Sequence, residues 1–337
     1  MKVLLYLENK KGLANSGIGR ALYHQTKALE ASGIEYTYNP KDSFDVAHFN
    51  SYQGHTYRLM KKFKKRGIKV ISHGHSTHED FKESFRCWKL IAPIYNHWMN
   101  RMYKRADLII TPTEYSKSLI ENYPGVKCPV LAISNGLVLE EYLPKDKYIK
   151  EFEKFFNIKP QDKIVIGVGF YFKRKGIDDF FETARRMPKV KFIWFGHLSK
   201  ILTTRYINTC IKNKPENVIL PGYIAGDIIK GAYQRADCML FPTREETEGI
   251  VALEALACRL PLIVRDIGVY KDWLEDGKNC YKGKSVDDFV AKIKLCIFED
   301  QTKITEEGYK VVEERSIEKV GAKLKKAYLN LVETKNI

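Results

Sequence analysis

Short runs of apolar and β-branched residues alternate along the chain with longer stretches in which apolar residues recur at helical spacing. This pattern is typical of a parallel sheet whose strands are joined by crossover helices, and it occurs twice. In the first half, strands are predicted at residues 3–7, 46–49, 70–72, 108–111 and 130–133. In the second half, strands are predicted at residues 164–168, 192–195, 218–220, 239–241 and 262–264. The sequence therefore predicts an α/β protein with two doubly wound domains.

A segment rich in Lys, Glu and Pro, residues 143–160, separates the two halves and is the predicted domain boundary. We place the first domain at residues 1–145 and the second at residues 146–312. Residues 313–337 are expected to form a C-terminal helix that packs back on the first domain. Ligands of doubly wound folds bind beyond the carboxyl ends of the strands, so we expect the active site in the cleft between the domains.

Composition limits the class of protein. A chain of 337 residues with 44% hydrophobic content can bury a core in each of two domains. The start, MKVLLYLEN, is interpreted as a first strand rather than a signal peptide, and the seven scattered cysteines contain no C-x-x-C pair. The longest apolar run, IVIGVGFYF, is less than half of the roughly 20 residues that a spanning helix needs. We expect a cytoplasmic protein that can lie on a bilayer without crossing it.

The net charge of +16 is concentrated between Arg58 and Arg105. This region holds thirteen Lys and Arg against three acids, an excess of ten, and its aromatic residues include Trp88 and Trp98. Basic residues interleaved with aromatic ones indicate a membrane-surface segment. The alternative is a set of helices with buried aromatic faces and solvated basic backs. Nucleic acid is a weaker alternative, because no zinc spacing, RNP-like motif or helix-turn-helix pattern accompanies the charge.

Glycine-rich segments follow one predicted strand in each half. In Ser16-Gly-Ile-Gly-Arg20, Gly17 and Gly19 are expected to let backbone N–H groups approach a phosphate or a sugar oxygen, with a plain tight turn as the alternative. In the second half, GVGFYFKRKG places Arg174 and Lys175 just before a helix. Such a basic pair can neutralise a diphosphate, since arginine binds two oxygens and lysine acts as a point charge.

Two further motifs contain candidate catalytic residues. EETEGIVALEALA is predicted to be a helix with two acids, Glu246 and Glu254, separated by seven residues. By themselves they also fit a capping acid and a surface glutamate. HGHST places His73 and His75 at the end of a predicted strand, where a neutral imidazole can hydrogen-bond a sugar hydroxyl or a developing charge.

These motifs together, with SNG near the boundary and FPTRE just before the E-x7-E pair of Glu246 and Glu254, resemble those of a retaining glycosyltransferase over nearly the whole chain. More narrowly, KRKGIDDFFETARRM and HGHSTHEDFKESF resemble the bacterial diacylglycerol glycolipid glycosyltransferases of family four, of the diglucosyldiacylglycerol synthase kind. The resemblance implies the GT-B architecture, two Rossmann-like domains facing across a cleft. It further implies that the first domain faces the acceptor and the membrane and that the second binds the nucleotide sugar.

The resemblance also implies roles for individual residues. Glu246 would contact the hydroxyls of the donor sugar, and Glu254 would hold the nucleotide ribose. Gly249 and Ile250 would lie at a helix N-terminus beside the pyrophosphate, which Lys175 would also bind as a catalytic cation. Arg174 would bind the diphosphate of the donor. His75 would lie against the reacting sugar, with His73 as the alternative for this role. Many relatives carry an arginine where this chain has Phe170.

The function predicted in this way is metal-independent transfer, with retention, of glucose or galactose from a UDP-sugar to a membrane glycolipid. No D-x-D motif is present in the sequence, and no tightly bound cofactor is expected. The acceptor expected is monoglucosyldiacylglycerol, which would give diglucosyldiacylglycerol; diacylglycerol and a soluble or cell-surface glycan are the alternatives. The protein would lie at the inner face of the cell membrane through residues 58–105, without nucleic acid as a partner.

Two other classes of function stay open at this point. A nicotinamide dehydrogenase would explain the Rossmann-like pattern, but G-x-G-x-x-G with an acid about 20 residues later is missing. A non-catalytic protein that binds membranes or nucleic acid would explain the basic segment alone. The donor sugar, the linkage and the oligomeric state are not determined by the sequence.

Overall fold

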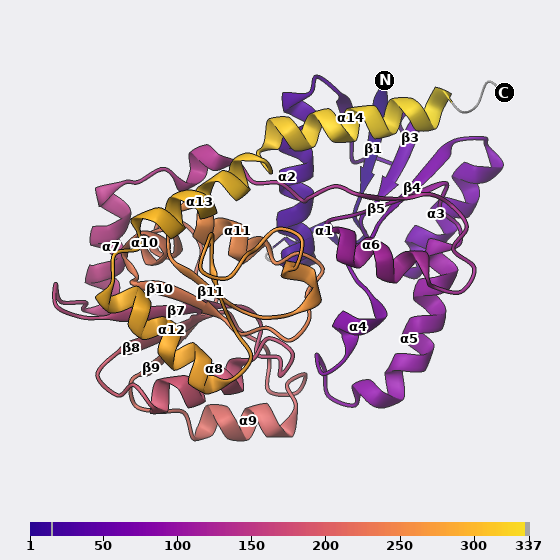
Figure 1. Cartoon of the computed structure of the whole chain (residues 1–337). Helices are drawn as coiled ribbons and strands as arrows, with labels where there is room; N and C mark the ends of the chain where they lie inside the picture. The colour runs from indigo at the N-terminus through magenta and orange to yellow at the C-terminus, as the bar shows by residue number, and fades with distance from the viewer. Residues whose placement is uncertain (15, 334–337) are drawn as a thin grey trace. The chain divides into compact units, whose positions relative to one another are not determined.

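The structure is a computed structural model that describes residues 1–14 and 16–333. It divides into two compact units (Figure 1). Unit 1 comprises Met1–Glu79, Ile91–Val138 and the segment from Glu314 onward. Unit 2 comprises Asp80–Leu90 and Leu139–Glu313. Each unit is described by itself below.

Unit 1 is built on a six-stranded parallel sheet with the strand order β2-β1-β3-β4-β5-β6. Its strands are β1 (Lys2–Tyr6), β2 (Glu35–Thr37), β3 (Val46–Phe49), β4 (Lys69–His73), β5 (Leu108–Thr111) and β6 (Val130–Ala132). All residues of β3 and β5 are buried, as expected for central strands covered on both faces. The apolar runs of the sequence form strands because both of their faces meet a core.

Helices cover this sheet. They are α1 (Lys10–Leu13), α2 (Gly17–Ala31), α3 (Gly54–Lys65), α4 (His78–Phe81), α5 (Trp88–Tyr103), α6 (Glu114–Glu121) and α14 (Ile317–Glu333), of which α4 and α5 each have a few residues in unit 2. The C-terminal helix α14 packs against α2, and both contribute to the core around β1 (Figure 1). Tyr328 of α14 is fully buried in this core.

Unit 2 repeats the design with the strand order β12-β11-β10-β7-β8-β9, again all parallel. Its strands are β7 (Ile164–Val168), β8 (Lys191–Phe195), β9 (Val218–Gly222), β10 (Cys238–Phe241), β11 (Leu262–Arg265) and β12 (Tyr281–Gly283). Strands β8 and β9 continue from β7 on one side, whereas β10 pairs with its other side. The strand order therefore reverses between β7 and β10, and such a reversal leaves a crevice beyond the strand ends where ligands bind.

The helices of unit 2 are α7 (Asp146–Phe156), α8 (Ile177–Arg185), α9 (Arg205–Lys212), α10 (Asp227–Arg235), α11 (Ile250–Ala257), α12 (Val286–Phe298) and α13 (Thr302–Glu313). Two short 3₁₀ helices, η1 (Leu139–Tyr142) and η2 (Gly268–Tyr270), lie before α7 and after β11. The core of the unit contains Trp194 and the phenylalanines of β8 and α8.

The ten predicted strands are present, some with bounds that differ by one or two residues. Two further strands, β2 and β12, were not predicted; both are three residues long and lie at sheet edges. The structural division falls between residues 138 and 139, whereas the sequence placed it between 145 and 146. The reason is that residues 139–145, which include η1, contact α10 and α11 of unit 2: the Tyr142 hydroxyl donates to Glu254, and the Lys145 N–H donates to Gln234.

Residues 80–90 differ most from the expected division, because they belong to unit 2 although the chain around them belongs to unit 1. Within the residues that the structure describes, no helix has the length and apolar character that a membrane span requires.

Candidate functional site

The loop between β10 and α11, residues 242–249, contains Glu246 and follows a strand at the reversal point of the sheet. The Glu246 side chain is 9% exposed, and its Oε1 accepts a hydrogen bond from Thr243 Oγ1 at 2.8 Å and from Lys175 Nζ. Arg174 Nη1 lies 3.7 Å from the same oxygen. Because Lys175 and Arg174 come from the loop after β7, the two loops at the carboxyl ends of neighbouring strands join one acid to two cations.

Burial governs the ionisation of this cluster. Burial alone would raise the pKa of Glu246, but the charges of Lys175 and Arg174 outweigh it and hold the pKa below its ordinary value. Burial also lowers the pKa of Lys175 and exceeds the opposing attraction of Glu246. With the acid ionised and both cations protonated, the cluster has one net positive charge. A buried net positive charge at this position attracts an anionic group.

The loop after β7 is held from its other side by residues 80–90. Lys173 Nζ forms an ion pair with Glu83 at 2.7 Å, and Arg174 Nε donates to Ser84 Oγ at 2.9 Å. Arg174 Nη1 also donates to the carbonyl oxygen of Glu245 at 2.7 Å. These contacts explain why residues 80–90 belong to unit 2. Sequence reasoning missed Glu83 and Ser84, because their partners are about 90 residues away in the chain.

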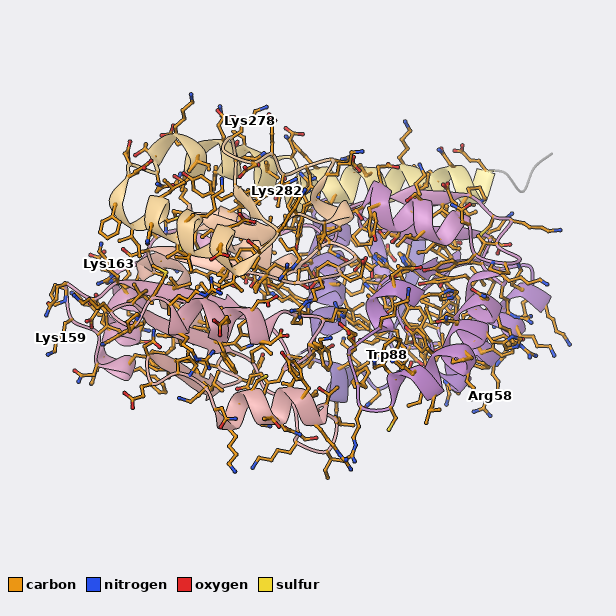
Figure 2. The ribbon with its side chains drawn as sticks, turned by 60° about the horizontal axis from the view of Figure 1, so that its bottom comes forward. Arg58, Trp88, Lys159, Lys163, Lys278 and Lys282 are labelled. Atoms are coloured by element: carbon orange, nitrogen blue, oxygen red, sulfur yellow. The ribbon has the colours of Figure 1, made fainter. Side chains whose placement is uncertain are left out.

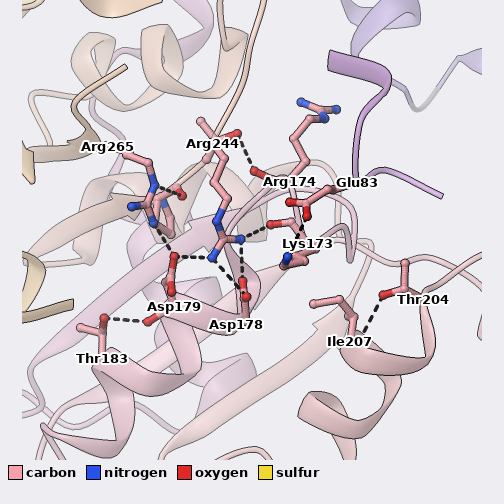
Figure 3. A network of polar contacts seen from close by, with 12 residues as sticks. Glu83, Lys173, Arg174, Asp178, Asp179, Thr183, Thr204, Ile207, Arg244 and Arg265 are labelled. Carbon is pink, nitrogen blue, oxygen red and sulfur yellow. Dashed lines mark hydrogen bonds and ion pairs between the residues drawn. The ribbon is translucent and has the colours of Figure 1, made fainter. Parts of the chain in front are cut away.

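The two loops also pack tightly at Gly176, the residue before α8. A Cβ atom placed on Gly176 would lie 2.2 Å from the carbonyl oxygen of Pro242, and its φ of +74° favours glycine. Next to this contact, Arg244 binds both acids of the first turn of α8, Asp178 and Asp179 (Figure 3). This cluster was not predicted either, since its members have no common motif.

Helix α11 begins at Ile250, four residues after Glu246, so the prediction of a helix that already includes Glu246 was wrong. The reason is Gly249, whose φ of +88° lies in the left-handed region and ends the loop. The hydroxyl of Tyr270 lies 3.1 Å from the position of a Cβ on Gly249. It is buried and has no hydrogen-bond partner among residues 1–14 and 16–333. The start of α11 therefore brings the first N–H groups of a helix close to a buried tyrosine that sequence reasoning missed.

Glu254 lies one turn into α11 and is held by two tyrosines. Its Oε1 accepts a hydrogen bond from Tyr142 and its Oε2 accepts one from Tyr233, each at 2.8 Å. The carboxylate is thus fixed in orientation by η1 and α10. In the expected ribose contact, the tyrosines would orient the carboxylate that binds the ribose. Neither tyrosine was predicted from the sequence.

In unit 1, His75 lies two residues after β4 and is 9% exposed. Its Nε2 is 2.7 Å from Asn50 Oδ1, and its ring stacks on the ring of His73 with centroids 4.0 Å apart. His73 in turn has its Nδ1 3.1 Å from Nε2 of His48. Burial, followed by the neighbouring histidines, holds the pKa of His75 well below its usual value. The imidazole is therefore neutral and oriented by Asn50.

The glycine loop before α2 has a mixed outcome. A Cβ on Gly19 would lie 2.2 Å from the carbonyl oxygen of Leu13, so this glycine is required by close packing. Gly17 is exposed, and a Cβ there would meet no atom within 4 Å. Ser16 caps α2 by accepting a hydrogen bond from the Gly19 N–H at 3.2 Å. The roles of both glycines toward a ligand stay predictions.

Comparisons with known proteins identify the family of the chain. The family model described as Glycosyl transferases group 1 matches residues 149–311, and Glycosyltransferase Family 4 matches residues 39–141. A processive diacylglycerol alpha-glucosyltransferase of Acholeplasma laidlawii is 52% identical, over 99% of this chain and 100% of its own length. An alpha-galactosylglucosyldiacylglycerol synthase of Streptococcus pneumoniae is 26% identical, over 82% of this chain and 76% of its own length.

Solved structures share the fold. Sucrose-phosphate synthase from Thermosynechococcus elongatus matches with a TM-score of 0.82 at 14% identity, covering 99% of this chain and 100% of its own. Anabaena Alr3699/HepE in complex with UDP and glucose matches with a TM-score of 0.76 at 15% identity, covering 97% and 99%. The chain belongs to the family-four glycosyltransferases and has the two Rossmann-like domains of the GT-B fold. Family membership confirms the resemblance. It argues against the two alternative classes of function, a nicotinamide dehydrogenase and a non-catalytic protein that binds membranes or nucleic acid.

Proposed function

We propose that the protein transfers glucose or galactose from a UDP-sugar to a diacylglycerol-based glycolipid acceptor, with retention and without a metal ion. The observation that supports this most is the buried cluster of Glu246, Lys175 and Arg174 at the strand ends of unit 2. The names of the Acholeplasma and Streptococcus relatives support a lipid acceptor and a hexosyl donor. Monoglucosyldiacylglycerol is the proposed acceptor, and diglucosyldiacylglycerol is the product.

Each residue of the cluster has a role in this proposal. Arg174 and Lys175 bind the diphosphate of the donor, together with the N–H groups at Gly249 and Ile250. Glu246 hydrogen-bonds the hydroxyls of the transferred sugar, and Lys175 stabilises the charge that develops on the leaving phosphate. The bond between the anomeric carbon and the phosphate oxygen breaks while the bond to the acceptor oxygen forms on the same face. The acceptor hydroxyl gives its proton to the departing phosphate.

His75 is the proposed unit 1 partner of the reacting sugar. Its imidazole is neutral and is oriented by Asn50, and a neutral imidazole can hydrogen-bond a sugar hydroxyl. Glu254 is proposed to hold the ribose through the carboxylate that Tyr142 and Tyr233 orient.

Membrane docking through residues 58–105 is part of the proposal. Arg58, Lys61, Lys62 and Lys65 are exposed on α3, and Arg58 points outward from the ribbon (Figure 2). Helix α5 exposes three large apolar side chains: Leu90 (78%), Ile91 (45%) and Ile94 (74%). These residues, rather than Trp98, suit an interfacial anchor, because Trp98 is half-buried and donates its Nε1–H to the Tyr52 carbonyl. Basic side chains beside exposed apolar ones favour an anionic lipid surface.

The experiment is incubation with radiolabelled UDP-glucose or UDP-galactose in mixed micelles that contain diacylglycerol or monoglucosyldiacylglycerol. We expect a labelled diglycosyl lipid from the second acceptor, equal rates with and without EDTA, and an α-anomeric proton in the NMR spectrum of the product. A β-linked product contradicts retention, and loss of activity with EDTA that Mg²⁺ restores contradicts metal independence. A faster reaction with diacylglycerol or with a soluble glycan would mean that this compound, and not monoglucosyldiacylglycerol, is the acceptor.

A further inference from the structure

Four charged side chains, Arg244, Arg265, Asp178 and Asp179, form a cluster of ion pairs, and Arg244 belongs to the loop that contains Glu246 (Figure 3). Arg244 donates from Nη1 to Asp178 Oδ1 at 2.8 Å and from Nη2 to Asp178 Oδ2 at 3.1 Å and Asp179 Oδ2 at 2.6 Å. Arg265 donates to the same Asp179 oxygen. The cluster therefore contains two cations and two anions, with the Asp179 carboxylate shared between the two arginines.

The cluster is mostly removed from water. The exposed fractions of the side chains are 27% for Arg244, 15% for Arg265, 8% for Asp178 and 23% for Asp179. Burial is the largest influence on Asp179 and raises its pKa, against the lowering effect of Arg244. Burying paired charges costs desolvation energy that roughly cancels their attraction, so a cluster of this kind is weak evidence for stability. Its fixed geometry is the more informative property.

The arginines of the cluster also bind the backbone at both ends of the donor loops. The Arg244 guanidinium donates to the carbonyl oxygen of Lys173, and its backbone N–H donates to the carbonyl oxygen of Arg174 at 2.7 Å. Arg265 donates from Nε to the Pro242 carbonyl at 3.1 Å and from Nη1 to the Lys284 carbonyl at 2.9 Å. The Arg244 side chain thus connects the first turn of α8 to Lys173, which lies two residues before Lys175. Arg244 itself lies two residues before Glu246.

We propose that Arg244 is a positioning residue, which, with Asp178, Asp179 and Arg265, fixes the loop of Glu246 against the loop of Lys175. This inference rests on the proposed donor site, and it assigns no contact with substrate to any member of the cluster. The guanidinium is needed for its shape, since it makes four hydrogen bonds to acceptors on three residues. A lysine at this position would keep the charge but could not reach all of these acceptors at once.

The test compares Arg244→Lys with Arg235→Lys as a matched control. Arg235 forms an ion pair with Glu153 at 2.7 Å and donates to the carbonyl oxygens of Lys159 and Pro160, so it has the same mixture of partners in the same unit. It binds α10 to the region of α7 and, within the part of the chain that the structure describes, forms no hydrogen bond or ion pair with either donor loop. Arg235→Lys therefore measures the general cost of losing such an arginine.

We expect Arg244→Lys to lower kcat on UDP-glucose by about 10- to 100-fold, because small misplacements of catalytic groups have effects of this size. Its dissociation constant for UDP should change less than about threefold, since it touches no ligand. Arg235→Lys should leave kcat within about twofold of the parent. The double variant Arg244→Gln with Asp179→Asn should be no slower than the slower single variant, because both substitutions break the same connection.

Hydrogen exchange of the amides of residues 243–249 gives a second measurement that needs no transfer activity. We expect faster exchange there in Arg244→Lys than in the parent and in Arg235→Lys. The inference is overturned if kcat and loop exchange in Arg244→Lys match the parent, or if both arginine variants change equally. If the parent transfers no sugar while exchange at residues 243–249 still rises in Arg244→Lys, the proposed function fails and the positioning of the loop stands.

Discussion

At the scale of single residues, the two acids of the E-x7-E motif have different surroundings, and this difference predicts different roles. Glu246 is paired with cations that suit a phosphate, whereas Glu254 is paired with neutral tyrosines. A carboxylate between cations lies where a charged leaving group would be bound. A carboxylate oriented by hydroxyls is in surroundings that suit a neutral group such as a ribose, because an ionised carboxylate accepts hydrogen bonds from hydroxyls.

We therefore expect Glu246→Gln to lower kcat at least about 100-fold while the dissociation constant for UDP stays within about threefold. Glu254→Ala should instead weaken UDP binding about tenfold or more, by loss of the ribose contact and of the partner of two tyrosine hydroxyls. Glu254→Gln, which still accepts hydrogen bonds from the tyrosines, should lose less. Calorimetry with UDP and initial rates with UDP-glucose check both. The opposite pattern, with UDP affinity lost in Glu246→Gln, would reverse the two assignments.

The sequence identified Glu246, Lys175 and Arg174 as candidates because each lies in a motif next to a strand end. It did not identify Arg244, Arg265 or Tyr270, although Arg244 stands in the FPTRE stretch. Their importance depends on partners that are far away in the chain: Arg244 meets Asp178 across 66 residues and Arg265 meets Asp179 across 86. Periodicity and spacing within one segment do not contain this information.

At the scale of secondary structure, the same limit applies to weak elements. The buried strands were predicted because most of their residues are apolar, whereas β2, with the sequence EYT, has no such run and is held by pairing with β1. Helix α7 was interpreted as a boundary segment from its Lys and Glu content. In the structure its apolar residues, including Tyr148 and Phe152, are buried, so the charges are on its outer face. Amphipathic helices next to domain boundaries are easily mistaken for linkers.

Elements of unit 1 also form a buried histidine network. His48 on β3 lies between His73 on β4 and Tyr328 on α14, to whose hydroxyl its Nδ1 approaches within 2.8 Å. His75 stacks on His73, and His24 on α2 is fully buried as well. Burial lowers the pKa of all four histidines, to about 3 for His24 and His73 and well below 6.5 for the other two.

This network predicts how stability depends on pH. The unfolded chain binds protons at these histidines as the pH falls through 6.5, whereas the folded state stays neutral until much lower pH. Their contribution is thus fully present above pH 6.5 and is lost toward acid, by up to about 1.4 kcal/mol per histidine and pH unit. A carboxylate with a lowered pKa, such as Glu246, contributes stability that is fully present above its unfolded pKa, near 4.5, so this contribution is lost only at lower pH than the contribution of the histidines.

We expect the urea concentration at the midpoint of unfolding to fall as the pH is lowered from about 7.5 to about 6.5 and then to about 5.5. At the lowest pH, unfolding should take up as many as about four protons. His24→Gln should lower this uptake by about one proton. Potentiometric measurement of proton uptake in unbuffered solution checks the number. Uptake of fewer than about two protons would mean that these histidines are already charged in the folded protein.

At the scale of the whole molecule, the excess of positive charge is the feature to explain. Of the lysines in the α3 cluster, Lys64 is committed to an ion pair with Asp107 at 2.8 Å and donates to the Arg105 carbonyl. Lys64 is therefore less available to a lipid surface than the other exposed cations of the same helix. Exposed charges near an anionic bilayer contribute about 1 kcal/mol each, so several of them suffice for binding without a spanning helix.

We expect that a variant with four exposed cations of α3 replaced by glutamine binds phosphatidylglycerol vesicles at least about tenfold more weakly at low salt than the parent. The replaced residues are Arg58, Lys61, Lys62 and Lys65. Replacing Ile94, which is 74% exposed on α5, by serine should weaken binding further, because a buried isoleucine side chain contributes about 1.5–3 kcal/mol. UDP affinity should stay at the parental value in both variants, since none of these residues lies in the donor site of unit 2.

A control variant removes the same charge from other surfaces, at Lys159, Lys271, Lys323 and Lys326, all of which are exposed. Co-sedimentation with vesicles at low and moderate salt, together with activity on lipid acceptor in vesicles, distinguishes the two charge variants. If membrane docking depends on the α3 surface, the control keeps most of its binding and activity, and the α3 variant loses both. Equal losses in the two variants would mean that net charge, and not this surface, brings the protein to the bilayer. Unchanged sedimentation of the α3 variant would mean that its basic residues are the solvated face of a helix, and residues 58–105 would then have no part in docking.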